Sequence, residues 1–226
     1  MSMIFNRLRA HALELEKALG ARAFSTPSEN TTEWYTRNYT SAFIRRANLD
    51  VIETDKLYMM HLCVFPKTYD TAPLYGFDIV AGKNKVTGAF LDVSPLGDAQ
   101  HPLCKHFAQS VESSEWSKPR ELPDWAKKIF SPQMIAAGNI NTEFELIEIL
   151  NLSKNLLIHY LDNVGKHRPL GTYEELTSRY DFTEQQNFYC QQQKQNPHTP
   201  RVLKSLGFTE EMVSDYINNE LFPEVV

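Results

Sequence analysis

The sequence lacks the short motifs by which enzymes commonly hold a cofactor of their own. It contains no G-x-G-x-x-G dinucleotide fingerprint, no G-x-x-x-x-G-K-[ST] phosphate loop and no G-x-S-x-G nucleophile elbow. Its three cysteines, Cys63, Cys104 and Cys190, are widely separated and form neither C-x-x-C nor a metal-ligand spacing. We therefore expect no bound metal, nucleotide, flavin or iron–sulfur cluster, and any electrons for redox chemistry must come from outside the chain.

Excess positive charge and long apolar runs are also missing. The net charge of -5 argues against non-specific binding to nucleic acid or to a membrane surface as the main role. No apolar run approaches the roughly 18 residues of a membrane span, and the first twenty residues mix apolar and charged side chains, unlike a signal peptide. With so few cysteines, we expect a cytoplasmic protein in a reducing compartment. We also expect the protein to be a monomer.

Four stretches rich in β-branched, aromatic and other apolar residues predict the strands of a sheet. They cover residues 41–52, 57–66, 73–82 and 85–95. The connections between them are short, and the Gly82-Lys83-Asn84 turn is typical of a hairpin. Because such connections cannot hold crossover helices, we expect the strands to pair antiparallel.

Helical patterns lie on both sides of this block. Residues 1–20 predict an amphipathic helix, and residues 21–37 are expected to form a polar, irregular lead-in. Capping boxes at residues 142–145 (TEFE) and 172–175 (TYEE) each predict the start of a helix. The first of these helices is expected to end near Gly165 and to place these residues near one face: Phe144, Ile147, Leu150, Leu157 and Leu161.

The remaining helices are predicted near the end of the chain. Thr199 is expected to be an N-cap, with Pro200 at the first helical position and Gly207 as the stop, and residues 209–222 form a last helix. Residues 113–132 are expected to be a loop with one short helix. Together these elements predict an α+β fold, in which one domain over residues 1–226 holds a central antiparallel sheet flanked by helices.

Three polar residues interrupt the apolar strands. His61 lies in LYMMHLCVFP, Asp78 lies in PLYGFDIVAG, and Asp50 lies in the preceding strand. If the strands are neighbours, the three side chains converge on one patch, because side chains alternate along a strand. Burial raises the pKa of an aspartate and lowers that of a histidine, which suits both to proton donation near neutrality. The alternatives for single residues are a hydrogen-bonded core histidine and an aspartate that caps a turn.

Asp92 is a further acidic residue in a predicted strand. It lies close to the Ser94-Pro95 turn, so we interpret it as a strand-end residue and not as part of the patch.

Several stretches resemble the ferredoxin-dependent bilin reductases, and in particular their phycocyanobilin:ferredoxin oxidoreductase branch. They are MHLCVFP, PLYGFDIVAG, LDVSP, RELPDWAKKIFS, FYCQQQKQN and TPRVLKSLGF, which span most of the chain from about Phe43 to Leu221. The resemblance implies a three-layer α/β/α sandwich that binds biliverdin IXα between the sheet and the C-terminal helices. It also implies that no cofactor is bound, that single electrons come from a [2Fe-2S] ferredoxin, and that side chains supply protons to substrate radicals.

The resemblance assigns roles to individual residues. Asp78 matches the family's central aspartate, which protonates or hydrogen-bonds the pyrrole nitrogens, and His61 matches the histidine beside it. Arg120 matches an arginine that pairs with a propionate of biliverdin, although a surface salt bridge is the plain alternative. Trp125 matches a tryptophan near the pigment, and a core aromatic is the alternative for it.

The second propionate is expected near the helix predicted at Thr199. Free N–H groups and the helix dipole favour an anion there, with Arg201 and His198 beside it, and an ordinary capped helix is the alternative. His198 stands where the family has a lysine, which weakens that contact. The resemblance assigns further substrate contacts to the following residues: Asn48, Thr87, Gln193, Asn196 and Val202.

Asp50 is the departure that bears on the product. The phycocyanobilin-forming enzymes have a glutamate there, linked to reduction of the D-ring vinyl group, and Asn48 replaces a usual histidine. The shorter side chain resembles a phage and metagenomic side branch that forms phycoerythrobilin. We therefore expect four-electron reduction to phycoerythrobilin via 15,16-dihydrobiliverdin, with phycocyanobilin as the alternative product.

Two other classes of function fit these residues less well. A non-redox bilin carrier needs no buried proton donors, and a hydrolase that uses Asp50, His61 and Asp78 lacks an evident nucleophile. An enzyme that takes electrons from acidic ferredoxin predicts a basic patch, for which the candidates are Lys127, Lys128, Lys194, Arg201 and Lys204. Such a protein is expected in the cytoplasm of a cyanobacterium or of a cyanophage-infected host.

Overall fold

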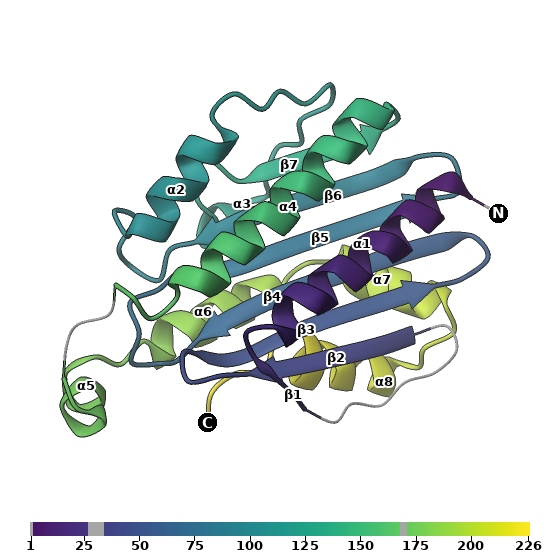
Figure 1. Ribbon diagram of the computed structural model, residues 1–226. Helices are drawn as coiled ribbons and strands as arrows, with labels where there is room; N and C mark the ends of the chain where they lie inside the picture. Colours follow the sequence, from purple (N-terminus) through teal and green to yellow (C-terminus); the bar gives the residue numbers. More distant parts are fainter. Residues whose placement is uncertain (1, 27–33, 168–170) are drawn as a thin grey trace.

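A seven-stranded antiparallel sheet divides the molecule into two helical layers (Figure 1). The computed structural model describes residues 2–26, 34–167 and 171–226. The strands lie in sequence order and each is hydrogen-bonded to the next; from β3 to β6 this antiparallel pairing is the one that the short connections predict. Their bounds are β1 Phe24–Thr26, β2 Trp34–Thr40, β3 Ile44–Glu53, β4 Leu57–Pro66, β5 Leu74–Gly82, β6 Val86–Ser94 and β7 Ile135–Ile140.

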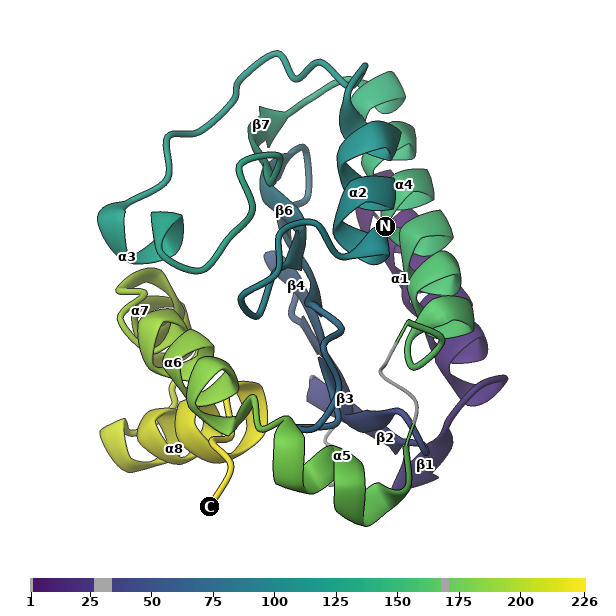
Figure 2. The same cartoon turned by 90° about the vertical axis from the view of Figure 1, so that its left-hand side faces the viewer.

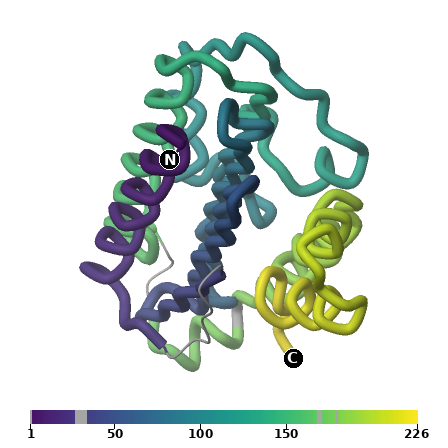
Figure 3. The backbone as a smooth tube through the Cα atoms, turned by 90° about the vertical axis from the view of Figure 1, so that its right-hand side faces the viewer, coloured from purple at the N-terminus to yellow at the C-terminus, as the bar shows by residue number. Residues whose placement is uncertain are grey.

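The helices cover both faces of the sheet, so the fold is the predicted α/β/α sandwich. One face packs against α1, α2 and α4, and α3, α6, α7 and α8 lie on the other side (Figures 2 and 3). Their bounds are α1 Met3–Gly20, α2 Pro102–Val111, α3 Asp124–Lys127, α4 Glu143–Asn163, α5 Tyr173–Arg179, α6 Thr183–Gln193, α7 His198–Ser205 and α8 Glu210–Asp215. A π-helix, η1, continues α8 over Tyr216–Leu221.

Alternation along the strands produces two separate cores. The cross-strand row of Leu49, Leu62, Phe77 and Leu91 belongs to the larger core, beneath α1, α2 and α4. Cys63, Phe65 and Leu74 belong to the smaller core, with Tyr189, Leu203 and Tyr216 from the C-terminal helices. Each fully buried side chain of this kind contributes roughly 1.5–3 kcal/mol to folding. None of the helices in the described part of the chain has the length and apolar character to cross a membrane.

Three expectations about local structure were wrong or incomplete. Residues 24–26 and 34–37 are strands and not an irregular lead-in, while residues 27–33 lie outside the described residues. The polar, aromatic sequence of β2 pairs with β3 along its length, so its order comes from the neighbouring strand. Helix α2 and strand β7 were not predicted.

The buried face of α4 also differs from the prediction. Leu150, Leu157 and Leu161 are buried, but Phe144 and Ile147 are 75% and 40% exposed. The helix is apolar over a wide arc, and packing against α1, α2 and the sheet selects a different stripe, made of Leu146, Ile149, Leu156 and Tyr160. Thr142 caps α4 and Thr172 forms a complete capping box, as predicted.

Buried His11 on α1 makes stability depend on pH. Its Nε2 lies 2.9 Å from the Ser153 hydroxyl, and that hydroxyl donates to the Leu150 carbonyl, so Nε2–H is the donor to Ser153. Burial, opposed in part by Glu14, lowers the pKa of His11 to about 4. The unfolded chain therefore binds a proton below pH 6.5 that the folded chain accepts only near pH 4, and stability falls as pH drops through this window.

Between pH 7 and pH 5, the unfolding free energy of the wild type should fall further than that of His11→Gln. We predict that this difference is about 2 kcal/mol. Urea denaturation at the two pH values measures this difference. His198→Gln, at an exposed histidine, is the control and should leave the wild-type difference unchanged. An equal pH dependence in His11→Gln and wild type would contradict the assignment.

Candidate active site

The three predicted polar residues lie in one straight row across the sheet. Asp50 on β3 is directly opposite His61 on β4, and His61 is directly opposite Asp78 on β5. The row continues to Thr36 on β2 and to Phe90 on β6. Directly opposed residues share a face, with Cβ atoms about 4.5–5.5 Å apart, so the alternation inferred from sequence brings the three side chains together.

His61 and Asp78 form a close pair. Nδ1 of His61 lies 2.6 Å from Oδ1 of Asp78, and the two side chains are 12% and 40% exposed. Burial alone lowers the pKa of His61, but the charge and hydrogen bond of Asp78, with the charge of Asp50, raise it above its ordinary value. The expectation that burial lowers this pKa was therefore wrong in direction, because the neighbouring carboxylates outweigh desolvation.

Asp50 is held by donors on both of its oxygens. The Thr36 hydroxyl donates to Oδ1 at 2.5 Å, and the Asn48 amide donates to Oδ2 at 2.8 Å. Tyr216 lies beside the same carboxylate, and burial, with the charge and hydrogen bonding of Asp50, raises the pKa of Tyr216 well above its ordinary value. Asp50 and Asn48 are 2% and 0% exposed, so Asn48 positions Asp50 in this conformation and has no accessible surface for a ligand.

The sheet is left partly open beside Asp78. Met59, Val80 and Phe90 lie on the same face as Asp78, in inner strands, yet each is only half-buried. A central strand whose side chains remain accessible has no layer packed closely over it. This part of the face is therefore the place where a flat ligand can reach Asp78.

Arg120 borders this open face. Its guanidinium lies 5.8 Å from the centre of the Phe90 ring and donates to the Thr87 carbonyl at 2.5 Å. Its side chain also packs over Gly138, where a Cβ atom would lie 2.6 Å from Arg120 Nε. Phe90 is opposite Asp78 in the row, so a cation and the exposed carboxyl lie at neighbouring points of one surface.

Trp125 and Gln193 lie on the side of the sheet that carries Asp78, and each contacts an aromatic residue there. Trp125 on α3 contacts Phe130 at 6.2 Å between ring centroids, and Phe130 contacts Tyr189 at 6.1 Å. The Gln193 amide donates to the Tyr189 hydroxyl at 2.8 Å. That hydroxyl lies 3.5 Å from the position of a Cβ atom on Gly76, two residues before Asp78.

The predicted anion site at the start of α7 is not formed as expected. The helix begins at His198, so Thr199 is its second residue and not the N-cap, and the N-cap residue, Pro197, makes no capping hydrogen bond with its own side chain. The side-chain oxygen Oδ1 of Asn196 accepts from the His198 N–H at 3.0 Å, and the helix begins two residues earlier than predicted. His198 and Arg201 are exposed and Thr199 and Val202 are half-buried, and their contact with a ligand remains a prediction.

The predicted basic patch is largely paired with acids. Lys194 contacts Glu224 and Lys204 contacts Glu210, each at 2.6 Å, and Lys127 lies 3.8 Å from Asp124. Among the residues that the structure describes, no acid pairs with Lys128 or Arg201. These two cations therefore remain the strongest candidates for contact with an acidic partner.

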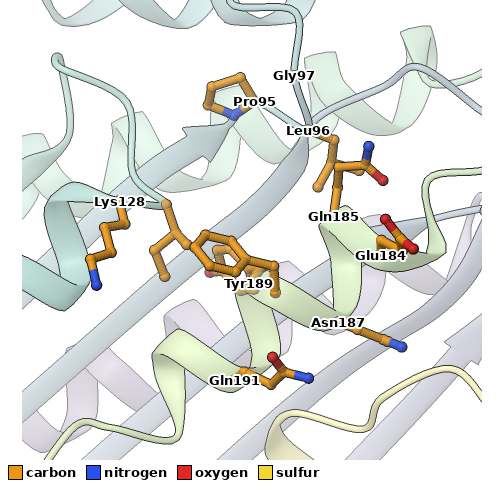
Figure 4. A pocket seen from close by; sticks show the side chains of 11 residues that line it. Pro95, Leu96, Gly97, Lys128, Glu184, Gln185, Asn187, Tyr189 and Gln191 are labelled. Atoms are coloured by element: carbon orange, nitrogen blue, oxygen red, sulfur yellow. The ribbon is translucent and has the colours of Figure 1, made fainter.

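Two surface cavities lie apart from the row. One, of about 630 Å³, is lined by Gly97, Lys128, Glu184, Tyr189 and Gln191, along α6 (Figure 4). The other, of about 650 Å³, lies between the start of α1 and the β5–β6 turn. Neither is bordered by His61 or Asp78. Within residues 2–26, 34–167 and 171–226, no group of three His, Cys, Asp or Glu side chains is arranged to hold a metal.

Sequence reasoning missed three residues that contact the row. Thr36 lies in the stretch expected to be irregular, although its place opposite Asp50 follows once β2 is recognised. Tyr216 and Phe222 come from the end of the chain, and Phe222 meets His61 edge to face at 5.4 Å. No local pattern in the last helix indicates that it packs over the sheet.

Asp92 lies near the end of β6 and outside the row, as interpreted from the sequence, and it is buried, at 1% exposure. Its carboxylate accepts from the Ser131 N–H and hydroxyl and from the Ser94 hydroxyl, at 3.0, 2.5 and 2.6 Å. Burial raises its pKa, against these hydrogen bonds. Asp92 thus ties the segment that follows α3 to the sheet.

We predict that Asp78→Asn lowers the pKa of His61, because the variant removes the nearest negative charge from the imidazole. Titration of the imidazole NMR signals of wild type and variant measures this shift. Asp55→Asn, at an exposed acid outside the row, is the matched control. An unchanged His61 titration in Asp78→Asn would show that the pair does not set the protonation state of His61.

Comparison with known proteins places the chain in one family. A model of the family described as ferredoxin-dependent bilin reductase matches residues 2–223. The phycocyanobilin:ferredoxin oxidoreductase of Trichodesmium erythraeum (strain IMS101) is 28% identical over 81% of this chain and 74% of its own length. That of Synechococcus sp. (strain CC9605) is 31% identical over 79% of this chain and 71% of its own length.

Two solved structures are similar in fold. A protein named PcyX matches with a TM-score of 0.70 and 30% identity, over 97% of this chain and 99% of that chain. Phytochromobilin synthase from tomato, solved with biliverdin, matches with a TM-score of 0.74 over 96% of this chain and 82% of that chain. Its 16% identity supports the likeness of fold alone.

Proposed function

Since the chain belongs to the ferredoxin-dependent bilin reductases, we propose that it reduces biliverdin IXα to phycoerythrobilin by way of 15,16-dihydrobiliverdin. The observation that carries the proposal is the His61–Asp78 pair, with the Asp78 carboxyl on the open part of the sheet. The electron donor is a [2Fe-2S] ferredoxin, and the protein binds no cofactor of its own. It acts as a monomer in the cytoplasm of a cyanobacterium or an infected host cell.

The overall reaction adds four electrons and four protons to biliverdin. Ferredoxin delivers the electrons singly, so the pigment passes through radical states, and two electrons with two protons complete each of the two reductions. Asp78 donates to the pyrrole nitrogens or to the carbon being reduced, and the imidazolium of His61 reloads it across the 2.6 Å contact. Water restores the protons after each cycle.

The surroundings of Asp78 suit a flat pigment that carries carboxylates. Met59, Val80 and Phe90 offer apolar contact on the same face, and Arg120 offers a guanidinium to one propionate. Lys128 and Arg201 are candidates for contact with acidic ferredoxin, because the other cations of the predicted patch are already paired.

Asp50 supports phycoerythrobilin over phycocyanobilin. Both of its oxygens already accept hydrogen bonds, its side chain is one methylene shorter than glutamate, and it is buried. It therefore lacks the reach that proton delivery to the D-ring vinyl group requires. Phycocyanobilin is the alternative product, because the relatives of known sequence are named phycocyanobilin:ferredoxin oxidoreductase.

Anaerobic turnover of biliverdin with reduced ferredoxin tests the proposal, with chromatographic identification of the products. We expect 15,16-dihydrobiliverdin to appear first and phycoerythrobilin to follow. Absence of any reduced bilin would refute the enzymatic function and favour a carrier. Phycocyanobilin as the main product would refute the product assignment alone.

Asp78→Asn is the variant that tests the proton donor within this assay. It should bind biliverdin, as followed by the pigment's absorbance, yet turn over about 10²–10⁴-fold more slowly. Asp98→Asn, at an exposed acid outside the row, should match wild type. Equal rates for Asp78→Asn and wild type would remove Asp78 from the mechanism.

Arg120 can be tested through its expected contact with a propionate. Arg120 is exposed, so its ion pair is worth about 1 kcal/mol, and Arg120→Ala should weaken biliverdin binding about fivefold. Biliverdin dimethyl ester, which lacks the carboxylates, should bind wild type and variant equally. Lys118→Ala, at an exposed cation nearby in sequence, is the control. A fivefold loss with the ester as well would show that Arg120 acts through packing and not through a propionate.

A further inference from the structure

Residues 216–225, close to the end of the chain, lie over part of the catalytic row; we call them the C-terminal cover. Tyr216, the first residue of η1, is 4% exposed and lies beside Asp50. Its ring meets Trp34 edge to face, at 4.6 Å between centroids and 82° between planes. Trp34 lies on β2, two residues before Thr36, so Tyr216 sits at the Asp50 end of the row.

Phe222 covers the middle of the row. Its ring meets the imidazole of His61 at 5.4 Å and 83°, and the side chain is 5% exposed. His61 Nε2 is buried and has no hydrogen-bond partner within the described residues. With the Phe222 ring packed on the imidazole and no partner at Nε2, the polar contact found for the His61 side chain within the described residues is the Nδ1 bond to Asp78.

The C-terminal cover is fastened to both the sheet and α6. Glu220 pairs with Arg46 on β3 at 2.8 Å. Val225 exchanges two hydrogen bonds with Asn187 on α6, at 2.7 and 3.0 Å, and Glu224 accepts from Lys194 and Gln191. Figures 1 and 3 show this end of the chain lying against the C-terminal helices.

Accessibility along the row is graded accordingly. Asp50 is 2% exposed, the His61 side chain 12% and the Asp78 side chain 40%. The sheet itself does not cause this gradient, because all three residues lie on one face of inner strands. Tyr216 beside Asp50 and Phe222 against His61 account for the low exposure of these two residues, while the Asp78 side chain keeps 40% of its surface.

We propose that Tyr216 and Phe222 are specificity-determining residues: they keep Asp50 and His61 away from the pigment and from water, so that protons reach the substrate through Asp78 alone. The effect on product specificity rests on the proposed function, whereas the cover itself is present in the free protein. When Asp78 gives a proton to the pigment, the imidazolium of His61 replaces that proton. Bulk water then reprotonates His61 by way of the exposed Asp78 carboxyl. The positions reduced on the pigment are then those that Asp78 reaches.

Solvent exchange of the His61 Nε2–H tests the cover without substrate. In protein with ¹⁵N-labelled histidine, we expect Phe222→Ala to exchange this proton at least tenfold faster than wild type, whereas Phe222→Leu, which keeps an apolar side chain, stays near wild type. Phe222→Val is the second truncation in case Phe222→Ala does not fold. Phe188→Ala removes an exposed ring on α6 and is the matched control. Equal exchange in wild type and both truncations would overturn the proposal.

Product analysis with biliverdin and reduced ferredoxin tests the specificity. We expect Phe222→Ala and Tyr216→Ala to increase at least fivefold the fraction of product that is reduced at positions that wild type leaves unreduced. Phe188→Ala should leave this fraction unchanged. Wild-type product ratios in both variants, with faster Nε2–H exchange in Phe222→Ala, would overturn the specificity role. If wild-type protein reduces no biliverdin, the proposed function fails, and the exchange measurement still decides whether the cover exists.

Discussion

The contact between His61 and Asp78 is the interaction on which the exposed side of the sheet depends. A charged pair in the middle of a seven-stranded sheet is costly to desolvate, and the cost is offset only where the partners are close and some water remains. Here the partners are 2.6 Å apart and Asp78 keeps two-fifths of its surface. An apolar layer packed over Asp78 would remove that water. The opening in the layer is thus what allows the pair to exist, and it is also what admits a ligand.

The two faces of the sheet divide these tasks. Under α1, α2 and α4 the buried side chains are mainly apolar, with the His11–Ser153 pair among them, and that core supplies most of the stability. The other face carries the row, and its covering helices are short. Its smaller core, built around Phe65, Tyr189 and Tyr216, holds one end of the C-terminal layer against the sheet and leaves the other end open.

Much of this arrangement could be predicted from sequence, because it depends on local period and on short connections. The bounds of β4 and the antiparallel order follow from apolar alternation and turn length, and so does the row of Asp50, His61 and Asp78. What depends on distant partners was missed. Strand β2 is polar and is ordered by β3, the buried stripe of α4 is selected by its neighbours, and Asn196 moves the start of α7. The contacts of Tyr216 and Phe222 join residues more than 150 positions apart, and no local pattern reports them.

A structure of the complex with biliverdin is the most direct test of the central claim, that Asp78 is the group through which protons reach the pigment. The account predicts pyrrole nitrogens or the lactam oxygen within about 2.6–3.2 Å of the Asp78 carboxyl. It also predicts that Phe222 still lies against His61 and that Asp50 still bonds to Thr36 and Asn48. A pigment bound in contact with Asp50, or away from Asp78, would contradict it.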